Sequence, residues 1–167
     1  GGKTHATDPG NASRTMLFNI HSMEWDSDLM KVFNIPETLL PEVRPSDALF
    51  GYTDASLVGA EIPVSGIMGD QQAALFGQLC HRAGMAKNTY GTGCFLLRNQ
   101  GTELPDEAND MLRTVAWQAG GEVHYAQEGS VFFAGAAVKW LRDKLDLLSS
   151  AAESEKIARS LEGNAGV

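Results

Sequence analysis

Short apolar runs separated by polar residues and glycines divide the chain into segments of helical and of strand character. The apolar run at residues 16–20 is short, which predicts a buried strand. In residues 25–33 apolar positions lie near helical spacing, and acidic residues at the start of this segment favour a helix. Residues 71–80 and 151–161 predict two further helices.

The second half of the sequence predicts two β-hairpins. Residues 85–90 and 94–99 flank Gly91-Thr92-Gly93, a pattern typical of a strand, a tight turn and a second strand. Residues 112–118 and 122–127 flank a glycine-containing turn and predict the second hairpin.

Two longer segments complete the pattern. Residues 44–61 are punctuated by Gly, Ser and Asp and predict a connection with at most one weak strand, whereas residues 130–148 predict a helix. Strands, hairpins and intervening helices together predict an α/β fold, with a junction near residues 79–86.

Composition narrows the class of protein. The 167 residues suit about one domain or parts of two, and the 21 Asp and Glu against 13 Lys and Arg, without a basic run, argue against nucleic-acid binding. No run approaches the ~20 apolar residues of a membrane span. Cys80 and Cys94 lie outside any CxxC spacing and the four histidines show no ligand spacing, so no disulfide framework and no metal site are expected, and the reducing cytoplasm is favoured.

Both ends of the sequence look interrupted. The chain opens Gly-Gly-Lys without Met and closes on Gly-Asn-Ala-Gly-Val just after a predicted helix. We therefore expect it to be a piece of a longer protein.

The segment Gly69-Asp70-Gln71-Gln72-Ala73 is the first candidate for chemistry, because it lies where an apolar segment turns into a predicted helix. Glycine permits close backbone approach there, and an Asp at such a turn can direct its carboxylate into a cleft. A carboxylate in that place can act as the base for an alcohol nucleophile. Asp is also a preferred helix N-cap residue, and the residues alone leave both interpretations open.

Two glycine-containing segments are candidates for ligand binding. In Gly91-Thr92-Gly93 the glycines leave backbone N–H groups unobstructed and Thr92 adds a hydroxyl, so the turn can cradle a phosphate, with a simple hairpin turn as the alternative. It is not a Walker loop. Residues 132–137, Phe-Phe-Ala-Gly-Ala-Ala, place small residues at a predicted helix start, where a flat ligand or another helix can approach; core packing is the alternative.

The three candidates occur in this order along the chain, and the first two lie within two of three longer strings. The strings are Asp8-x-x-Asn11-Ala12-Ser13-Arg14-Thr15-Met16-Leu17-Phe18-Asn19-Ile20, Gly66-Ile67-Met68-Gly69-Asp70-Gln71-Gln72-Ala73-Ala74-Leu75-Phe76-Gly77-Gln78 and Gly84-Met85-Ala86-Lys87-Asn88-Thr89-Tyr90-Gly91-Thr92-Gly93-Cys94-Phe95. Together they resemble the glycerol kinases of the FGGY carbohydrate kinase family, over nearly the whole chain and as the middle third of such a kinase.

The resemblance implies an actin-like, ribonuclease H-like ATPase fold of two domains that close on a cleft. Residues 1–80 would form the C-terminal part of the FGGY N-terminal domain, and residues 81–167 the N-terminal part of the FGGY C-terminal domain. The chain would thus span the end of the first domain and the start of the second.

For the acceptor, the resemblance implies three residues. Asp70 would be the base that accepts the glycerol hydroxyl proton, which favours the catalytic interpretation and is compatible with a cap. Gln71 would contact the glycerol hydroxyls, and Phe95 would lie against the carbon face of glycerol.

For the nucleotide, the resemblance implies the turn Gly91-Thr92-Gly93, with Thr92 at the ATP phosphates, and Gly135 in the nucleotide pocket. Lys139 replaces the Gln that the best-known bacterial members carry, so no contact is carried over to it.

The implied reaction of the full-length protein is ATP-dependent phosphorylation of glycerol to sn-glycerol 3-phosphate, with Mg²⁺ as cofactor. Glycerol, ATP and ADP would be its ligands, in a cytoplasmic homo-oligomer without a membrane span. The alternatives are another FGGY kinase that acts on a pentulose or a tetritol, a non-catalytic actin-fold module, and a folded fragment that only mediates interactions.

A first prediction concerns the 167 residues by themselves, which we expect to be inactive. The turn Gly91-Thr92-Gly93 would supply only one of the phosphate-contacting elements, and a cleft between domains needs both walls. Calorimetric titration with Mg·ATP, beside a coupled ADP assay with glycerol, is expected to show neither tight binding nor turnover. Robust turnover would contradict this view of what the chain contains.

Overall fold

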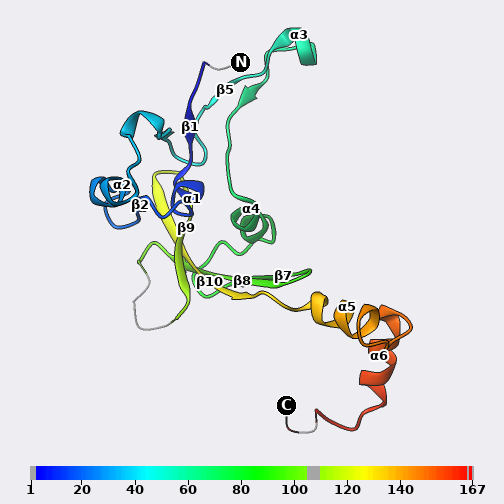
Figure 1. The fold of residues 1–167 in the computed structure, drawn as a ribbon. Helices are drawn as coiled ribbons and strands as arrows, with labels where there is room; N and C mark the ends of the chain where they lie inside the picture. Colours follow the sequence, from blue (N-terminus) through cyan, green and yellow to red (C-terminus); the bar gives the residue numbers. More distant parts are fainter. Residues whose placement is uncertain (1–2, 105–109, 165, 167) are drawn as a thin grey trace. The chain divides into compact units, whose positions relative to one another are not determined.

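The computed structural model describes residues 3–104, 110–164 and 166 (Figure 1). The helices are α1 (Pro9–Ala12), α2 (Ser27–Phe33), the 3-10 helix η1 (Glu37–Leu39), α3 (Ala55–Val58), α4 (Asp70–Gly77), α5 (Gly135–Asp143) and α6 (Ala151–Ser160). The short strands are β1 (Ala6–Thr7), β2 (Phe18–Asn19), β3 (Glu24–Trp25), β4 (Glu42–Val43), β5 (Gly51–Tyr52) and β6 (Pro63–Val64). The long strands are β7 (Ala86–Tyr90), β8 (Cys94–Gly101), β9 (Leu112–Ala119) and β10 (Glu122–Val131).

The chain forms two compact units. The first consists of residues 1–87 and 96–129, and the second of residues 88–95 and 130–167. The first unit therefore holds α4 and all of β9, and the second holds α5 and α6. The sequence predicts another division, into domains that meet near residue 80. That domain boundary stays a prediction, because the two compact units do not correspond to it.

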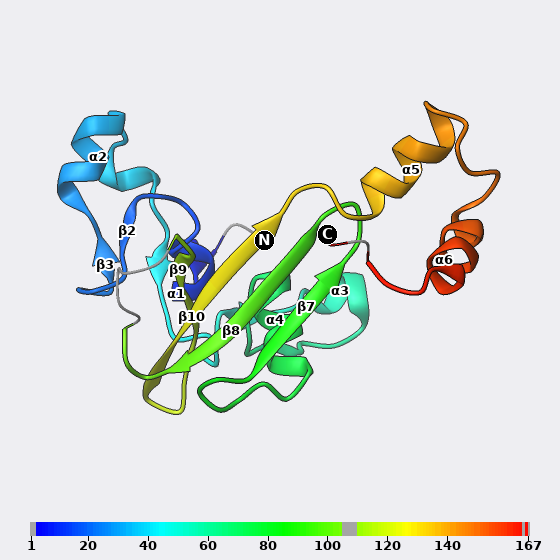
Figure 2. The same cartoon turned by 90° about the horizontal axis from the view of Figure 1, so that it is seen from below.

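The long strands form a sheet in the order β7-β8-β10-β9, and Figure 2 shows β7, β8 and β10 side by side. β9 and β10 pair antiparallel, from Glu122 opposite Ala119 to Glu128 opposite Leu112, with a register shift between His124 and Tyr125. Both predicted hairpins are thereby confirmed, because β7 and β8 are also neighbours in the sheet.

The main core of the first unit lies between α4 and the sheet. Leu75 of α4, Leu97 of β8, and Ala116 and Ala126 of β9 and β10 are fully buried in one hydrophobic cluster, which Cys80 and Trp117 complete. Burial of such side chains stabilises the fold by about 1.5–3 kcal/mol for each large one. The helix α4 is therefore fixed against the sheet by the face that carries Leu75, while Asp70 at its start stays exposed.

The outer edge of β9, the last strand of the sheet, is covered by polar groups from three earlier segments. The Ser46 N–H donates to Gln118 O over 2.7 Å, and the Gln118 N–H donates to Ser46 Oγ over 3.1 Å. Farther along the strand, the Val115 N–H donates to Ser13 Oγ over 3.2 Å and Val115 O accepts from Gln72 Nε2 over 3.5 Å. An uncovered edge strand would leave these backbone groups open to pairing with another chain.

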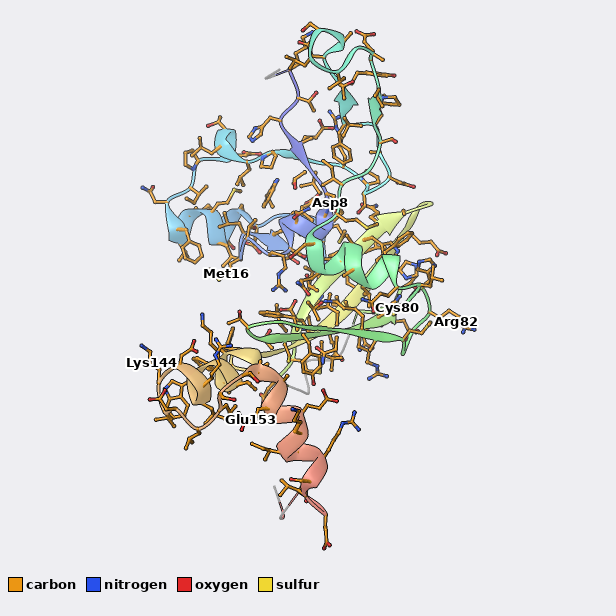
Figure 3. The ribbon with its side chains drawn as sticks, turned by 90° about the vertical axis from the view of Figure 1, so that its right-hand side faces the viewer. Asp8, Met16, Cys80, Arg82, Lys144 and Glu153 are labelled. Carbon is orange, nitrogen blue, oxygen red and sulfur yellow. The ribbon has the colours of Figure 1, made fainter. Side chains whose placement is uncertain are left out.

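Asp8 joins the segments that cover this edge. Its side chain is fully buried, and its carboxylate accepts hydrogen bonds from the N–H groups of Gly10 and Asn11, from Asn11 Nδ2 and from Ser46 Oγ at 2.6–3.2 Å. As the N-cap of α1, Asp8 fixes the helix that packs against β9, within the first unit (Figure 3). Burial of this polar side chain is tolerated because four hydrogen-bond donors surround it.

Local structure departs from the sequence predictions in four places. The strand expected over residues 16–20 shrinks to β2, because Met16 adopts a left-handed φ of +62° and is 72% exposed. Trp25 pairs in β3 with Phe18, so the helix expected from residue 25 begins only after its N-cap, Asp26. Residues 44–61 contain a helix, α3, beside β5.

The fourth departure lies at the end of the sheet. The helix expected over residues 130–148 is α5 alone, because β10 continues to Val131 and carries Phe132 and Phe133 past the sheet before α5 begins. These two phenylalanines are 72% and 78% exposed, so neither belongs to a core in the described part of the chain.

We expect Asp8→Ala to lower the free energy of unfolding by about 3 kcal/mol, because it removes a helix cap and strips buried donors of their acceptor. Chemical denaturation of the wild type and of Asp8→Ala, monitored by tryptophan fluorescence, measures the change in the free energy of unfolding. Asp54→Ala is the matched control, since Asp54 caps the exposed helix α3 through the Ser56 N–H. Equal losses in the two variants would show that burial of the Asp8 carboxylate contributes nothing.

Candidate active site

The N-terminus of α4 presents an exposed carboxylate. Asp70 is the first residue of the helix, and Gly69 occupies the N-cap position without a side-chain cap. The capping alternative for Asp70 is therefore wrong in detail, although a negative charge in the first turn is still favourable. Asp70 Oδ1 accepts from the Gln71 N–H over 2.8 Å, and Asp70 Oδ2 accepts from Gln71 Nε2 over 3.4 Å.

Gly69 is needed where it stands because its neighbours leave no room for a side chain. A Cβ at this position would lie 2.6 Å from Gln72 Oε1 and 3.3 Å from Asn11 Oδ1. The buried Gln72 is held in turn by the carbonyls of Gly10 and Val115, each 3.5 Å from its Nε2. The start of α4 is thus fixed to both α1 and β9.

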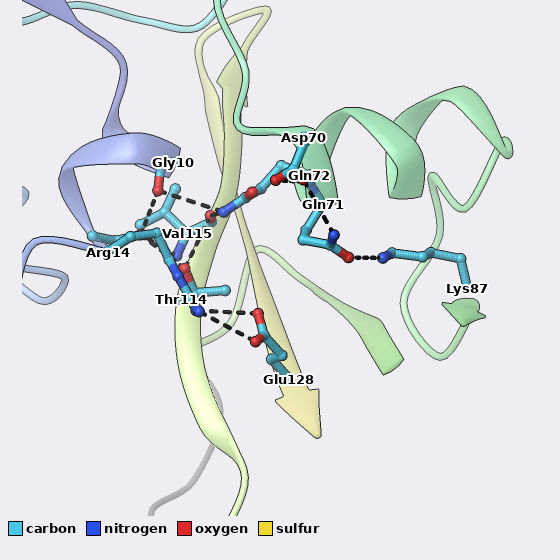
Figure 4. Close-up of polar contacts among 10 residues, drawn as sticks. Gly10, Arg14, Asp70, Gln71, Gln72, Lys87, Thr114, Val115 and Glu128 are labelled. Atoms are coloured by element: carbon cyan, nitrogen blue, oxygen red, sulfur yellow. Dashed lines mark hydrogen bonds and ion pairs between the residues drawn. The ribbon is translucent and has the colours of Figure 1, made fainter. Parts of the chain in front are cut away.

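Lys87 of β7 reaches the same helix end, as Figure 4 shows. Its ammonium group donates a hydrogen bond to Gln71 Oε1, while the Gln71 amide nitrogen faces Asp70. Lys87 is only 2% exposed, although lysines are rarely buried without partners. Burial lowers the pKa of Lys87, and the negative charges of Glu128 and Asp70 oppose that change.

An ion pair between Arg14 and Glu128 adds two further charges, and the Glu128 carboxylate acts on Lys87. Both Arg14 terminal nitrogens lie 3.2 Å from Glu128 oxygens, and the Glu128 side chain is 5% exposed. Arg14, Glu128, Lys87 and Asp70 therefore alternate in sign within the first unit. Such alternation keeps each buried or half-buried charge near a compensating one.

In the second unit, the turn Gly91-Thr92-Gly93 is joined to the start of α5. The N–H groups of Ala134 and Gly135 donate to Thr92 O and Gly91 O over 2.8 and 3.0 Å. A Cβ on Gly135 would lie 2.7 Å from Gly91 O, and a Cβ on Gly93 would lie 2.7 Å from Val131 O. Close backbone packing therefore requires glycine at both positions.

A pocket of about 340 Å³ lies beside this turn, within the second unit. Its lining residues are Thr92, Gly135, Ala136, Lys139, Trp140, Asp143 and Lys144. Two lysines and the Thr92 hydroxyl make it suitable for an anionic ligand, and Trp140 adds an aromatic surface. Arg142 binds Asp143 through two hydrogen bonds of 2.6 and 3.1 Å, which lowers the pKa of Asp143 and leaves that carboxylate paired.

The structure brings the expected site residues together in two groups. Asp70 and Gln71 are in contact in the first unit, and Thr92 and Gly135 line one pocket in the second. Phe95, half-buried in β8, also belongs to the second unit.

Sequence reasoning missed Lys87, Trp140 and Lys144. For Lys87 the sequence holds a signal of burial. Side chains alternate between the two faces of a strand, so Lys87 shares a face of β7 with Thr89, which is half-buried.

Among residues 3–104, 110–164 and 166, no group of three or more His, Cys, Asp and Glu side chains is placed to hold a metal ion. Within the same ranges, no helix has the length and apolar content to cross a membrane.

Comparison with known families identifies two adjoining matches. The N-terminal domain of the FGGY family of carbohydrate kinases matches residues 2–77, and the C-terminal domain of the same family matches residues 86–166.

Similar sequences extend over the whole chain. A glycerol kinase of Caldanaerobacter subterraneus subsp. tengcongensis is 54% identical over 99% of this chain and 33% of its own length. Glycerol kinase 2 of Thermotoga maritima is 53% identical over 100% of this chain and 34% of its own length. The chain thus spans about a third of the length of the curated relatives that it matches.

Solved structures agree with these matches. The crystal structure of Plasmodium falciparum glycerol kinase with ADP gives a TM-score of 0.86 at 36% identity, over 95% of this chain and 32% of that one. A xylulose kinase from Rhodospirillum rubrum gives 0.76 at 22% identity, over 96% and 33%, which shows a shared fold. The expected α/β fold of the actin-like, ribonuclease H-like type is confirmed, and the chain belongs to the FGGY family of carbohydrate kinases.

Proposed function

We propose that the full-length protein transfers the γ-phosphoryl group of ATP to glycerol and forms sn-glycerol 3-phosphate. The observation that carries the proposal is the exposed Asp70 carboxylate at the start of α4, next to a glutamine amide held in one orientation. Relatives named as glycerol kinases, 53–56% identical over nearly the whole chain, support glycerol as the acceptor.

On the acceptor side, Asp70 receives the proton of the attacking hydroxyl. Its carboxylate can do so because it is exposed, and the hydrogen bonds at 2.8 and 3.4 Å that it accepts both come from Gln71. Gln71 binds the glycerol hydroxyls, and Phe95 lies against the carbon face of glycerol. A positioned base of this kind contributes about 10²–10⁴ in rate.

On the nucleotide side, the pocket in the second unit fits a phosphate-bearing ligand. Thr92 offers a hydroxyl, Lys139 and Lys144 offer positive charge, and the glycine packing of the turn against Gly135 brings backbone close to the pocket. In the proposal, Thr92 with Gly91 and Gly93 contacts the phosphates and Gly135 borders the nucleotide. ATP would supply the phosphoryl group, and Mg²⁺ bound with it would neutralise part of the phosphate charge. Mg²⁺ typically binds through one or two carboxylates, phosphates and waters, so it needs no protein cage.

The same proposal includes the wider setting of the enzyme. Residues 1–80 complete the first domain of the kinase and residues 81–167 begin the second. The full-length protein is a cytoplasmic homo-oligomer, with glycerol and ATP or ADP as its ligands.

The test is ADP release from the full-length protein with a panel of acceptors. Glycerol is expected to give the highest kcat/KM, with a pentulose and a tetritol far below it. A preference for either of those would replace glycerol with that acceptor and retain a kinase. No ADP release with any acceptor would favour a non-catalytic module or a folded interaction segment.

We expect Asp70→Asn in the full-length protein to lower turnover by about 10² or more while glycerol affinity changes only a few-fold. The amide keeps the shape of the carboxylate but cannot accept the hydroxyl proton. Initial rates and calorimetric binding of glycerol measure the two effects. Asp54→Asn, on the exposed helix α3, serves as the control, and a variant at position 70 with nearly full turnover would contradict the assignment of the base.

We expect Gly135→Ala to raise the KM for ATP about tenfold or more and to leave the KM for glycerol within a factor of two. The added Cβ would meet Gly91 O at 2.7 Å, so the turn and the start of α5 must separate. Steady-state kinetics with each substrate varied in turn provide the measurement. Gly163→Ala is the matched control, because nothing lies within 4 Å of its Cβ position, and equal KM values in both variants would remove this turn from the nucleotide site.

A further inference from the structure

The buried ammonium group of Lys87 settles which way the Gln71 amide faces. A protonated lysine has donors only, and an ionised carboxylate has acceptors only. Gln71 lies between one of each, with Oε1 accepting from Lys87 Nζ and Nε2 donating to Asp70 Oδ2 (Figure 4). A flipped amide would put oxygen against the Asp70 carboxylate and nitrogen against the ammonium group, so both contacts would be repulsive.

We propose that Lys87 is a positioning residue of the acceptor site, which acts through Gln71 to select a hydroxyl that donates to Asp70 and accepts from Gln71. This inference rests on the proposed phosphoryl transfer to an alcohol. It gives Lys87 a role without any contact to substrate.

The hydrogen-bond inventory explains the selection. Of the two Gln71 Nε2 hydrogens, one is directed at Asp70, and the second can donate to a ligand oxygen. A hydroxyl group satisfies this pair of partners, because its oxygen accepts from Gln71 while its proton points at Asp70. An amine that is protonated at neutral pH has no lone pair for Gln71, so the same site disfavours it.

The surrounding charges favour the protonated form of Lys87, which is the form that this role needs. Burial of a lysine favours the neutral amine, which could accept a hydrogen bond and so release the amide orientation. The charges of Glu128 and Asp70 act against this effect on the Lys87 pKa. Arg14, in turn, compensates Glu128 through two contacts of 3.2 Å.

The geometry of Lys87 distinguishes it from the exposed lysines of the chain. Its side chain is 2% exposed and starts from β7, a strand of the central sheet, whereas Lys156 lies on the exposed face of α6. A donor that is fixed by the sheet holds Gln71 more precisely than one on a mobile side chain, and small misplacements in such sites cost up to about 10² in rate.

The experiment uses the full-length protein with Lys87→Met, which keeps the length of the side chain and removes its donors. We expect kcat/KM for glycerol to fall about tenfold to a hundredfold, while the KM for ATP stays within a factor of two. Lys87→Arg should recover part of the loss, because it restores donors. Lys156→Met is the control and is expected to match the wild type.

A double-mutant cycle shows whether Lys87 acts through Gln71. Adding Lys87→Met to Gln71→Leu should cost less than a factor of two, because the amide that Lys87 orients is already gone. Independent, multiplicative losses would overturn the inference and leave Lys87 with a merely structural role.

Gln71→Glu serves if Lys87→Met does not fold. Its carboxylate can still pair with the buried Lys87 but cannot donate to a hydroxyl, so glycerol affinity measured by calorimetry should fall at least tenfold in a folded protein. Unchanged affinity would overturn the inference. A wild type that phosphorylates no polyol overturns the proposed function together with this inference, whereas an active wild type with an unaffected Lys87→Met overturns the inference alone.

Discussion

The first compact unit depends on the coverage of one sheet edge. β9 is the last strand of the sheet, and the groups on its outer edge bond to Ser13, Ser46 and Gln72 instead of to another strand. The buried Asp8 carboxylate ties Ser46 to α1 and so holds the cover together. Because unsatisfied buried backbone groups are costly, this requirement fixes the N-terminal segment, the Ser46 loop and α4 against the same strand.

Coverage of this edge also positions the chemistry. The buried Gln72 amide is hydrogen-bonded to β9 and α1. Asp70 and Gln71 directly precede Gln72 in the chain, so these hydrogen bonds also fix the position of the exposed Asp70 carboxylate. On its other side, α4 is fixed by Leu75 in the hydrophobic core. A site on an element held at both faces stays precise without ligand, which is what transfer by positioning requires.

Lys87 and Gly135 show two physical means of fixing a site. Lys87 uses hydrogen-bond polarity, since a group with donors only leaves the Gln71 amide one favourable orientation. Gly135 uses space, since the Gly91 carbonyl can approach only where no Cβ stands. Both depend on segments that are distant in sequence, with β7 reaching α4 in the first unit and the turn after β7 reaching α5 in the second.

The sequence by itself determined the two hairpins and the helices α4 and α6, because hydrophobic periodicity and turn residues are local properties. The strings around Asp70 and Thr92, which are also local, determined the family and the residues of the proposed site. Tertiary structure decided the rest. The strand predicted at residues 16–20 is shorter in the structure because Met16 adopts a left-handed conformation. The helix α5 begins later than predicted because β10 continues to Val131. That Gln72 supports β9, and that Lys87 meets Gln71, follows from long-range hydrogen bonds between buried polar groups, which have no periodic signal in the sequence.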